Sequence, residues 1–133
     1  MNYEDYIRQA VRTESRDFPV IISRLLGRFS NNTNNIRILH ALMGMQTELG
    51  ELVDNFKKYV FYGKESDTIN IKEELGDLEW YLAILYDTYR YQFHRDEVLQ
   101  SNIAKLRARY PEKFTEENAN TRNLEAERNE LTK

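Results

Sequence analysis

Residues 36–61, IRILHALMGMQTELGELVDNFKKYVF, decide the fold of this 133-residue chain. Apolar residues return in this stretch at intervals of three and four, which is the period of an amphipathic helix. The stretch therefore predicts one long helix, which closes at Tyr62-Gly63-Lys64. A second long helix is predicted after the cap candidates Ser66 to Thr68, or one turn later at Asn70, and it extends to about Tyr91.

Shorter helices are predicted on either side of this pair. Few glycines and prolines interrupt the chain, five and two respectively, which weighs against turn-rich β architectures and favours an all-α fold. We expect one domain over residues 1–114 and a charged helical C-terminal arm over residues 115–133, which is either peripheral or an oligomer contact. The shorter predicted helices are Tyr3–Thr13, Val20–Phe29 and Asp96–Arg109.

Composition excludes several classes of protein. The chain has no cysteine, so a disulfide framework and a Cys-ligated zinc site are excluded. Its net charge of −3 offers no positive field to nucleic acid or to an anionic membrane. No apolar run approaches the ~18 residues of a membrane span, and Met1–Tyr6 carries no signal-peptide pattern, so we expect a cytoplasmic protein.

One short acidic pattern occurs twice, as ELGEL at residues 48–52 and as ELGDL at residues 74–78. At about 100° per residue, the first acid of each copy falls on the apolar side of its helix, and the second lies at the edge of that side. Ionised carboxylates at such positions cost several kcal/mol unless a cation meets them. A mid-helix glycine costs about 1 kcal/mol relative to alanine, so Gly50 and Gly76 suggest a close backbone approach or a packing need.

Two interpretations of the repeated acids remain open at this point. They are either surface acids paired with lysine or arginine, or the two helices pair antiparallel and bring two acids each to one site. Four carboxylates without cysteine or histidine form a hard-oxygen site that suits Mg²⁺ or Mn²⁺, and Mg²⁺ sites commonly bridge to substrate phosphates. A ferritin-like di-iron site would need Glu-x-x-His, which neither His40 nor His94 completes.

At these residues the sequence resembles the MazG-like, all-α nucleoside triphosphate pyrophosphohydrolases. The signature of that superfamily is Glu-x-x-Glu, a variable spacer and Glu-x-x-Asp, which Glu48-x-x-Glu51 and Glu74-x-x-Asp77 match. The resemblance implies a four- to five-helix bundle with an antiparallel central helix pair, completed by oligomerisation as a homodimer or homotetramer. It also implies hydrolysis of a nucleoside triphosphate between its α and β phosphates. Further stretches that resemble the family are residues 39–41, 47–52, 62–64, 73–77, 80–81 and 102–111.

The resemblance also implies roles for individual residues. The four signature acids would hold Mg²⁺, with Mn²⁺ as a possible substitute, and one of them or Glu73 would orient or deprotonate the attacking water. Residues of the fifth helix would reach the nucleotide, although the same side chains can simply solvate that helix. The implied metal ligands are Glu48, Glu51, Glu74 and Asp77, and the implied substrate residues of the fifth helix are Asn102, Lys105, Arg109 and Tyr110.

Two further residues are candidates for substrate binding. Lys57, with Lys58 and Lys64, can help to hold phosphates, or it can serve as a helix-end cation. Trp80 can stack a base, or it can belong to the core. Relatives that prefer dCTP carry a lysine and an asparagine where this chain has Asn102 and Leu106, a departure that speaks against a cytosine preference.

Three functions are therefore compared. The first is a Mg²⁺-dependent pyrophosphohydrolase that removes non-standard or excess nucleoside triphosphates. The second is an all-α dUTPase or dCTPase of the same superfamily, which differs only in base selection. The third is a catalytically silent helical oligomer that binds a partner, against which the four intact acids count because a silent protein has no reason to keep buried charge.

Overall fold

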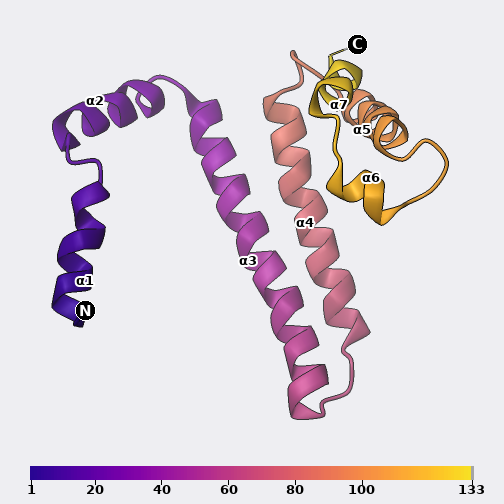
Figure 1. Cartoon of the computed structure of the whole chain (residues 1–133), viewed down its shortest axis with the longest axis horizontal. Coiled ribbons are helices and arrows are strands. Elements are labelled where there is room, and N and C mark those ends of the chain that lie inside the picture. The colour runs from indigo at the N-terminus through magenta and orange to yellow at the C-terminus, as the bar shows by residue number, and fades with distance from the viewer. Residues whose placement is uncertain (133) are drawn as a thin grey trace.

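The computed structural model describes residues 1–132, and all of its regular elements are helical, as the sequence predicts. In Figure 1, α3 and α4 form a long antiparallel pair, α2 leads into the start of α3, α1 stands apart on the far side of α3 from α4, and α5, α6 and α7 lie on the side of α4 away from α3. No helix in the described part of the chain is both long and apolar enough to cross a membrane. The elements are α1 (Tyr3–Ala10), the 3₁₀ helix η1 (Val11–Thr13), α2 (Phe18–Phe29), α3 (Thr33–Tyr62), α4 (Thr68–Thr88), α5 (Arg95–Arg109), α6 (Glu116–Asn120) and α7 (Leu124–Leu131).

Helix α3 is the long helix expected from residues 36–61. It begins three residues earlier, at Thr33, because the side chain of Asn32 accepts a hydrogen bond from the backbone N–H of Asn34 at 3.1 Å and caps the helix. It ends as predicted at Gly63, whose φ of 62° is left-handed, a conformation that glycine adopts without a Cβ penalty.

Helix α4 returns along α3. Its cap is Asp67, whose side chain accepts hydrogen bonds from the backbone N–H groups of Ile69 at 3.2 Å and Asn70 at 3.0 Å. The helix therefore begins at the earlier of the two predicted starts. It ends at Thr88, short of the predicted Tyr91, and turns lead on to α5.

Contacts along the whole length hold α3 against α4. At one end, Arg37 Nη2 lies 2.5 Å from Asp87 Oδ2. At the other end, the Asn55 amide donates to Asn70 Oδ1 at 2.9 Å. Between them Ala41 is completely buried, and it is the only buried hydrophobic side chain among the described residues. The pair is therefore a long rod with a thin core.

The glycine that the helix pair needs is Gly44, and neither Gly50 nor Gly76 meets the expectation of a close approach within this chain. A Cβ atom on Gly44 would lie 2.0 Å from Cζ of Tyr81, whereas a Cβ on Gly50 or Gly76 would meet nothing within 4 Å. The ring of Tyr81 also packs at 4.7 Å from that of Trp80. The tight approach thus lies one turn before the first acidic motif.

We expect Gly44→Ala to lower the free energy of unfolding by about 1–3 kcal/mol, because the added methyl forces the Tyr81 ring out of its place. Gly50→Ala is the matched control on the same helix, and we expect it to raise the free energy of unfolding by about 0.5–1 kcal/mol through helix propensity. Urea denaturation followed by circular dichroism measures both changes. Equal effects of the two substitutions would contradict the close packing of Tyr81 on Gly44.

The remaining helices contact this rod only sparsely. Helix α7, in the predicted C-terminal arm, packs against α5, whereas α2 contacts α3 at few positions. Many large apolar side chains consequently remain exposed in the single chain, among them Leu26 of α2 and Val53 and Phe56 of α3. Lys133, the last residue of the predicted arm, lies outside the described residues.

Candidate metal centre

Three of the four signature acids meet between the two long helices. Glu48 comes from α3, while Glu74 and Asp77 come from α4. One carboxylate oxygen from each lies within 4.8 Å of the others. Glu74 is buried with 4 % of its surface exposed, Glu48 is half-buried and Asp77 is exposed, so the cluster opens to solvent on the side of Asp77.

No lysine or arginine within residues 1–132 neutralises this cluster. Within residues 1–132, none of the three acids forms an ion pair with lysine or arginine. Burial raises the pKa of Glu48 above its ordinary value, and a hydrogen bond with Glu74 and repulsion from Glu74, Glu51 and Asp77 raise it further. The interpretation of surface acids with basic partners is therefore wrong for these three residues. Their carboxylate oxygens are the kind of ligand that a hard cation prefers.

Glu51 lies beside the cluster and not within it. Its exposed side chain lines a polar cavity of about 850 Å³, and Glu73 lines the same cavity. Neither acid has an ion-pair partner in the described part of the chain. The cavity lies next to the cluster, at the end of the helix pair where residues 63–67 connect α3 to α4.

The lysines of this end are arranged around Asp54. Lys57 Nζ lies 2.5 Å from Asp54 Oδ1, and Lys58 Nζ lies 2.6 Å from Asp54 Oδ2. The hydrogen bond from Lys57, followed by that from Lys58, lowers the pKa of Asp54 to about 2. Lys58 and Lys64 line the cavity, whereas the predicted substrate residue Lys57 is not among its lining residues.

Three of the predicted substrate residues lie on α5 and the fourth, Tyr110, is its C-cap. This helix packs against α7 and makes few contacts with α3 or α4. Asn102 is exposed, and Lys105 and Tyr110 are half-buried. Arg109 is engaged by Glu127 of α7, a carboxylate with 4 % of its surface exposed. Within one chain, these residues are therefore not brought to the acidic cluster.

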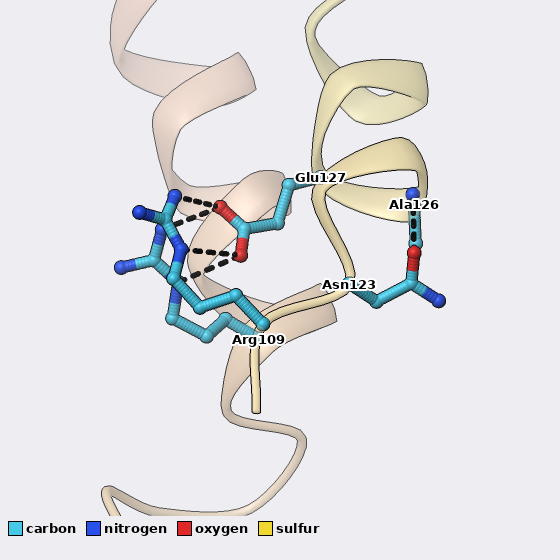
Figure 2. A network of polar contacts seen from close by, with 5 residues as sticks. Arg109, Asn123, Ala126 and Glu127 are labelled. Atoms are coloured by element: carbon cyan, nitrogen blue, oxygen red, sulfur yellow. Dashed lines mark hydrogen bonds and ion pairs between the residues drawn. The ribbon is translucent and has the colours of Figure 1, made fainter. Parts of the chain in front are cut away.

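Figure 2 shows how Glu127 holds Arg109. The carboxylate accepts from Arg109 Nε at 2.9 Å and from Arg109 Nη2, and it also accepts from Arg122 Nε at 3.2 Å and Arg122 Nη2 at 2.8 Å. Both pairs are bidentate, the strong geometry for a guanidinium and a carboxylate. Hydrogen bonds from Arg109 and then from Arg122 lower the pKa of Glu127 to about 2. The C-terminal arm is thus fixed to α5 by a buried ionic contact.

Trp80 lies one turn beyond Asp77 on α4. Of its surface, 54 % is exposed, and its ring is edge-on to that of His40 at 6.3 Å. The core alternative for Trp80 is therefore wrong within the single chain, and an apolar face of the ring is available to a ligand or to another copy.

Sequence reasoning missed two groups of polar residues. Asn55 and Asn70 form hydrogen bonds behind Glu74, and Glu127 with Arg122 fixes Arg109. A signal existed for the asparagines, because Asn70 precedes Glu74 by one helical turn and Asn55 lies on the same side of α3 as Glu48. No periodic signal connects Glu127 to Arg109, which is 18 positions away.

Fold and cluster together define an all-helical protein whose central helix pair carries carboxylates suited to a divalent cation. The family model of the MazG nucleotide pyrophosphohydrolase domain matches residues 37–114, which is more than half of the chain, and the chain belongs to this family. The matched region contains both acidic motifs, α4 and the whole of α5. Comparison with curated proteins and with solved structures gives no match.

Proposed function

We propose that the protein hydrolyses nucleoside triphosphates between the α and β phosphates, releases a monophosphate and pyrophosphate, and requires Mg²⁺. One observation carries the proposal: three carboxylates, which have no basic partner among residues 1–132, lie within 4.8 Å of one another beside a polar cavity. Membership in the nucleotide pyrophosphohydrolase family supports the reaction class. The specific bond and the Mg²⁺ requirement are inferred from the resemblance and from the chemistry of the oxygen ligands.

The residues present fit a hard divalent cation. Glu48, Glu74 and Asp77 would hold the ion, and Glu51 would complete the set from the adjacent turn of α3. All the donors are carboxylate oxygens, the ligands that Mg²⁺ and Mn²⁺ prefer, and the charge repulsion at Glu48 is what a bound cation would relieve. When bound, the ion neutralises phosphate charge and makes coordinated water more acidic.

The cavity is suited to the phosphate end of the substrate once a cation is present. Its lining contains five carboxylates, those of Glu51, Asp54, Glu65, Asp67 and Glu73, and two lysines, Lys58 and Lys64. Such an acidic lining repels a bare polyphosphate but admits one whose charge is neutralised. Lys64 has no ion-pair partner in the described part of the chain, so its ammonium group can contact a phosphate oxygen.

Glu51 and Glu73 are our candidates for the general base. Both line the cavity, and both are free of the ion pairs that hold Asp54. A carboxylate in this position can take the proton of an attacking water whose oxygen bonds to phosphorus, while the bond to the bridging oxygen between the α and β phosphates breaks. Glu51 would act in this role as a member of the metal-binding set, whereas Glu73 would act from beside the set.

A second copy of the chain would complete the substrate site. The thin core and the exposed apolar residues of α2 and α3 support a homodimer or homotetramer, whose mass light scattering measures. In such an assembly, Asn102, Lys105, Arg109 and Tyr110 of one copy would approach the nucleotide held by the other. The exposed ring of Trp80 is the candidate for stacking on the base.

A panel of canonical and modified nucleoside triphosphates with Mg²⁺ tests the proposal. We expect at least one of them to give its monophosphate and pyrophosphate in equal amounts, and we expect EDTA to stop the reaction. Release of single phosphates would contradict the proposed bond. Failure to cleave any nucleotide would favour the catalytically silent binding protein, and preferential cleavage of dUTP or dCTP would favour the second alternative.

A further inference from the structure

A chain of three polar side chains runs from α3 into the acidic cluster. Asn55 Nδ2 donates to Asn70 Oδ1 at 2.9 Å, and Asn70 Nδ2 donates to Glu74 Oε1 at 2.6 Å. Asn55 Nδ2 also lies 3.3 Å from the backbone carbonyl of Asp67, at the start of α4. Asn55 thus connects α3 to the first turn of α4. Asn70 in turn connects Asn55 to the carboxylate of Glu74.

The direction of these hydrogen bonds is fixed by the acid at their end. A carboxylate only accepts, so the NH₂ group of Asn70 must point at Glu74 and its carbonyl oxygen must point away. On that other side Asn55 supplies a donor at 2.9 Å. The backbone of Asn70 is held as well, because its N–H donates to Asp67 Oδ1 at 3.0 Å. Asn70 therefore has little freedom to turn.

This arrangement determines how Glu74 can present its carboxylate. Glu74 is the buried member of the cluster, and one of its oxygens is engaged by Asn70. With that oxygen held, rotation about the last side-chain bond breaks a short hydrogen bond at a buried position. Polar groups that hold metal ligands in this way commonly change metal affinity 10- to 100-fold when they are removed.

We propose that Asn70 is a positioning residue that sets the Glu74 carboxylate for a divalent cation, and that Asn55 holds Asn70 in the required orientation. The inference rests on the proposed function only in taking Glu74 as a metal ligand. Both asparagines also line the 850 Å³ cavity, so the same two side chains form the wall between the cavity and Glu74.

Binding of Mn²⁺ without substrate tests the proposal, with free Mn²⁺ measured by electron paramagnetic resonance. We expect Asn70→Ala to raise the Kd for Mn²⁺ by about 10- to 100-fold, and Asn55→Ala to raise it by a smaller factor. Asn34→Ala is the matched control: it removes an asparagine side chain from α3 far from the cluster, and we expect an unchanged Kd. In hydrolysis assays, high Mg²⁺ concentration should restore the kcat of Asn70→Ala.

The outcomes separate this inference from the proposed function. If the wild-type protein binds no Mn²⁺, the metal site itself is wrong. If the wild type binds Mn²⁺, Glu74→Gln does not, and both asparagine variants bind as tightly as the wild type, the positioning role is overturned. Circular dichroism checks the fold of each variant. If Asn70→Ala does not fold, Asn55→Ala decides: weaker Mn²⁺ binding supports the proposal, and unchanged binding overturns it.

Discussion

Replacing Asp77 with asparagine is expected to lower the rate of nucleotide hydrolysis by about 10³-fold or more and, at the same time, to raise the thermal midpoint of the metal-free protein. The rate falls because a bound metal stabilises transition-state charge by several kcal/mol, and each ~1.4 kcal/mol is tenfold in rate. The midpoint rises because the Asp77 charge repels Glu48, whose pKa is raised by burial first and by its acidic neighbours in addition. Asparagine keeps the size of the side chain and removes the charge.

The two effects are measured in the same samples. Thermal unfolding in EDTA gives the metal-free midpoint, and repeating it with Mg²⁺ gives the stabilisation by metal, which is about 2.7 kcal/mol at 100 times the Kd. We expect the variant to lose most of that stabilisation. Glu79→Gln is the matched control on α4. Glu79 is exposed and lies 3.7 Å from Arg95, which is also exposed, and such a surface ion pair contributes little to the free energy of unfolding. A variant that gains no metal-free stability and still responds fully to Mg²⁺ would contradict the metal centre.

Helical period predicted which sides of the two long helices the acids occupy, but it left open whether those acids pair with basic residues or meet at one site. Glu48 and Glu74 fall on the apolar sides of their helices, so antiparallel pairing brings them face to face, and Asp77 follows one turn after Glu74. The same period placed Glu51 at the edge of its helix side, and there it turns toward the cavity. A sequence indicates which residues lie on the apolar side of a helix. Which residues at the edge of that side enter a cluster depends on the angle and the position at which the two helices cross.

Properties that depend on tertiary detail could not be predicted in this way. Both motif glycines suggested close packing, but the close approach is at Gly44, where the large ring of Tyr81 happens to cross α3. The sequence of the charged tail shows no apolar period, and so it did not predict that the tail packs on α5. The contact that attaches the tail is ionic and runs through Glu127. Hydrophobic periodicity predicts apolar interfaces, but it does not predict an interface that depends on one buried carboxylate.

That ionic contact gives the second large effect. We expect Glu127→Gln to lower the thermal midpoint by about 5 °C or more at neutral pH, because the two guanidinium groups remain side by side without their shared counter-ion. The hydrogen bond to Glu127 raises the pKa of Arg122, whereas burial and then the charge of Arg109 act against that rise. A glutamine offers one acceptor oxygen where the carboxylate satisfies two bidentate partners.

The pH dependence gives this prediction its sign. The pKa of Glu127 is about 2 in the folded protein, below the ordinary 4.5, so its stabilising contribution is complete above about pH 4.5 and is lost as the pH falls toward 2. The difference in midpoint between the wild type and Glu127→Gln should therefore be constant near neutrality and shrink across that acidic window. Glu125→Gln is the matched control, because Glu125 lies two residues before Glu127 and its side chain is exposed. This variant should show the same midpoint as the wild type at every pH. A difference that persists unchanged at pH 2 would mean that Glu127 acts through packing and not through its charge.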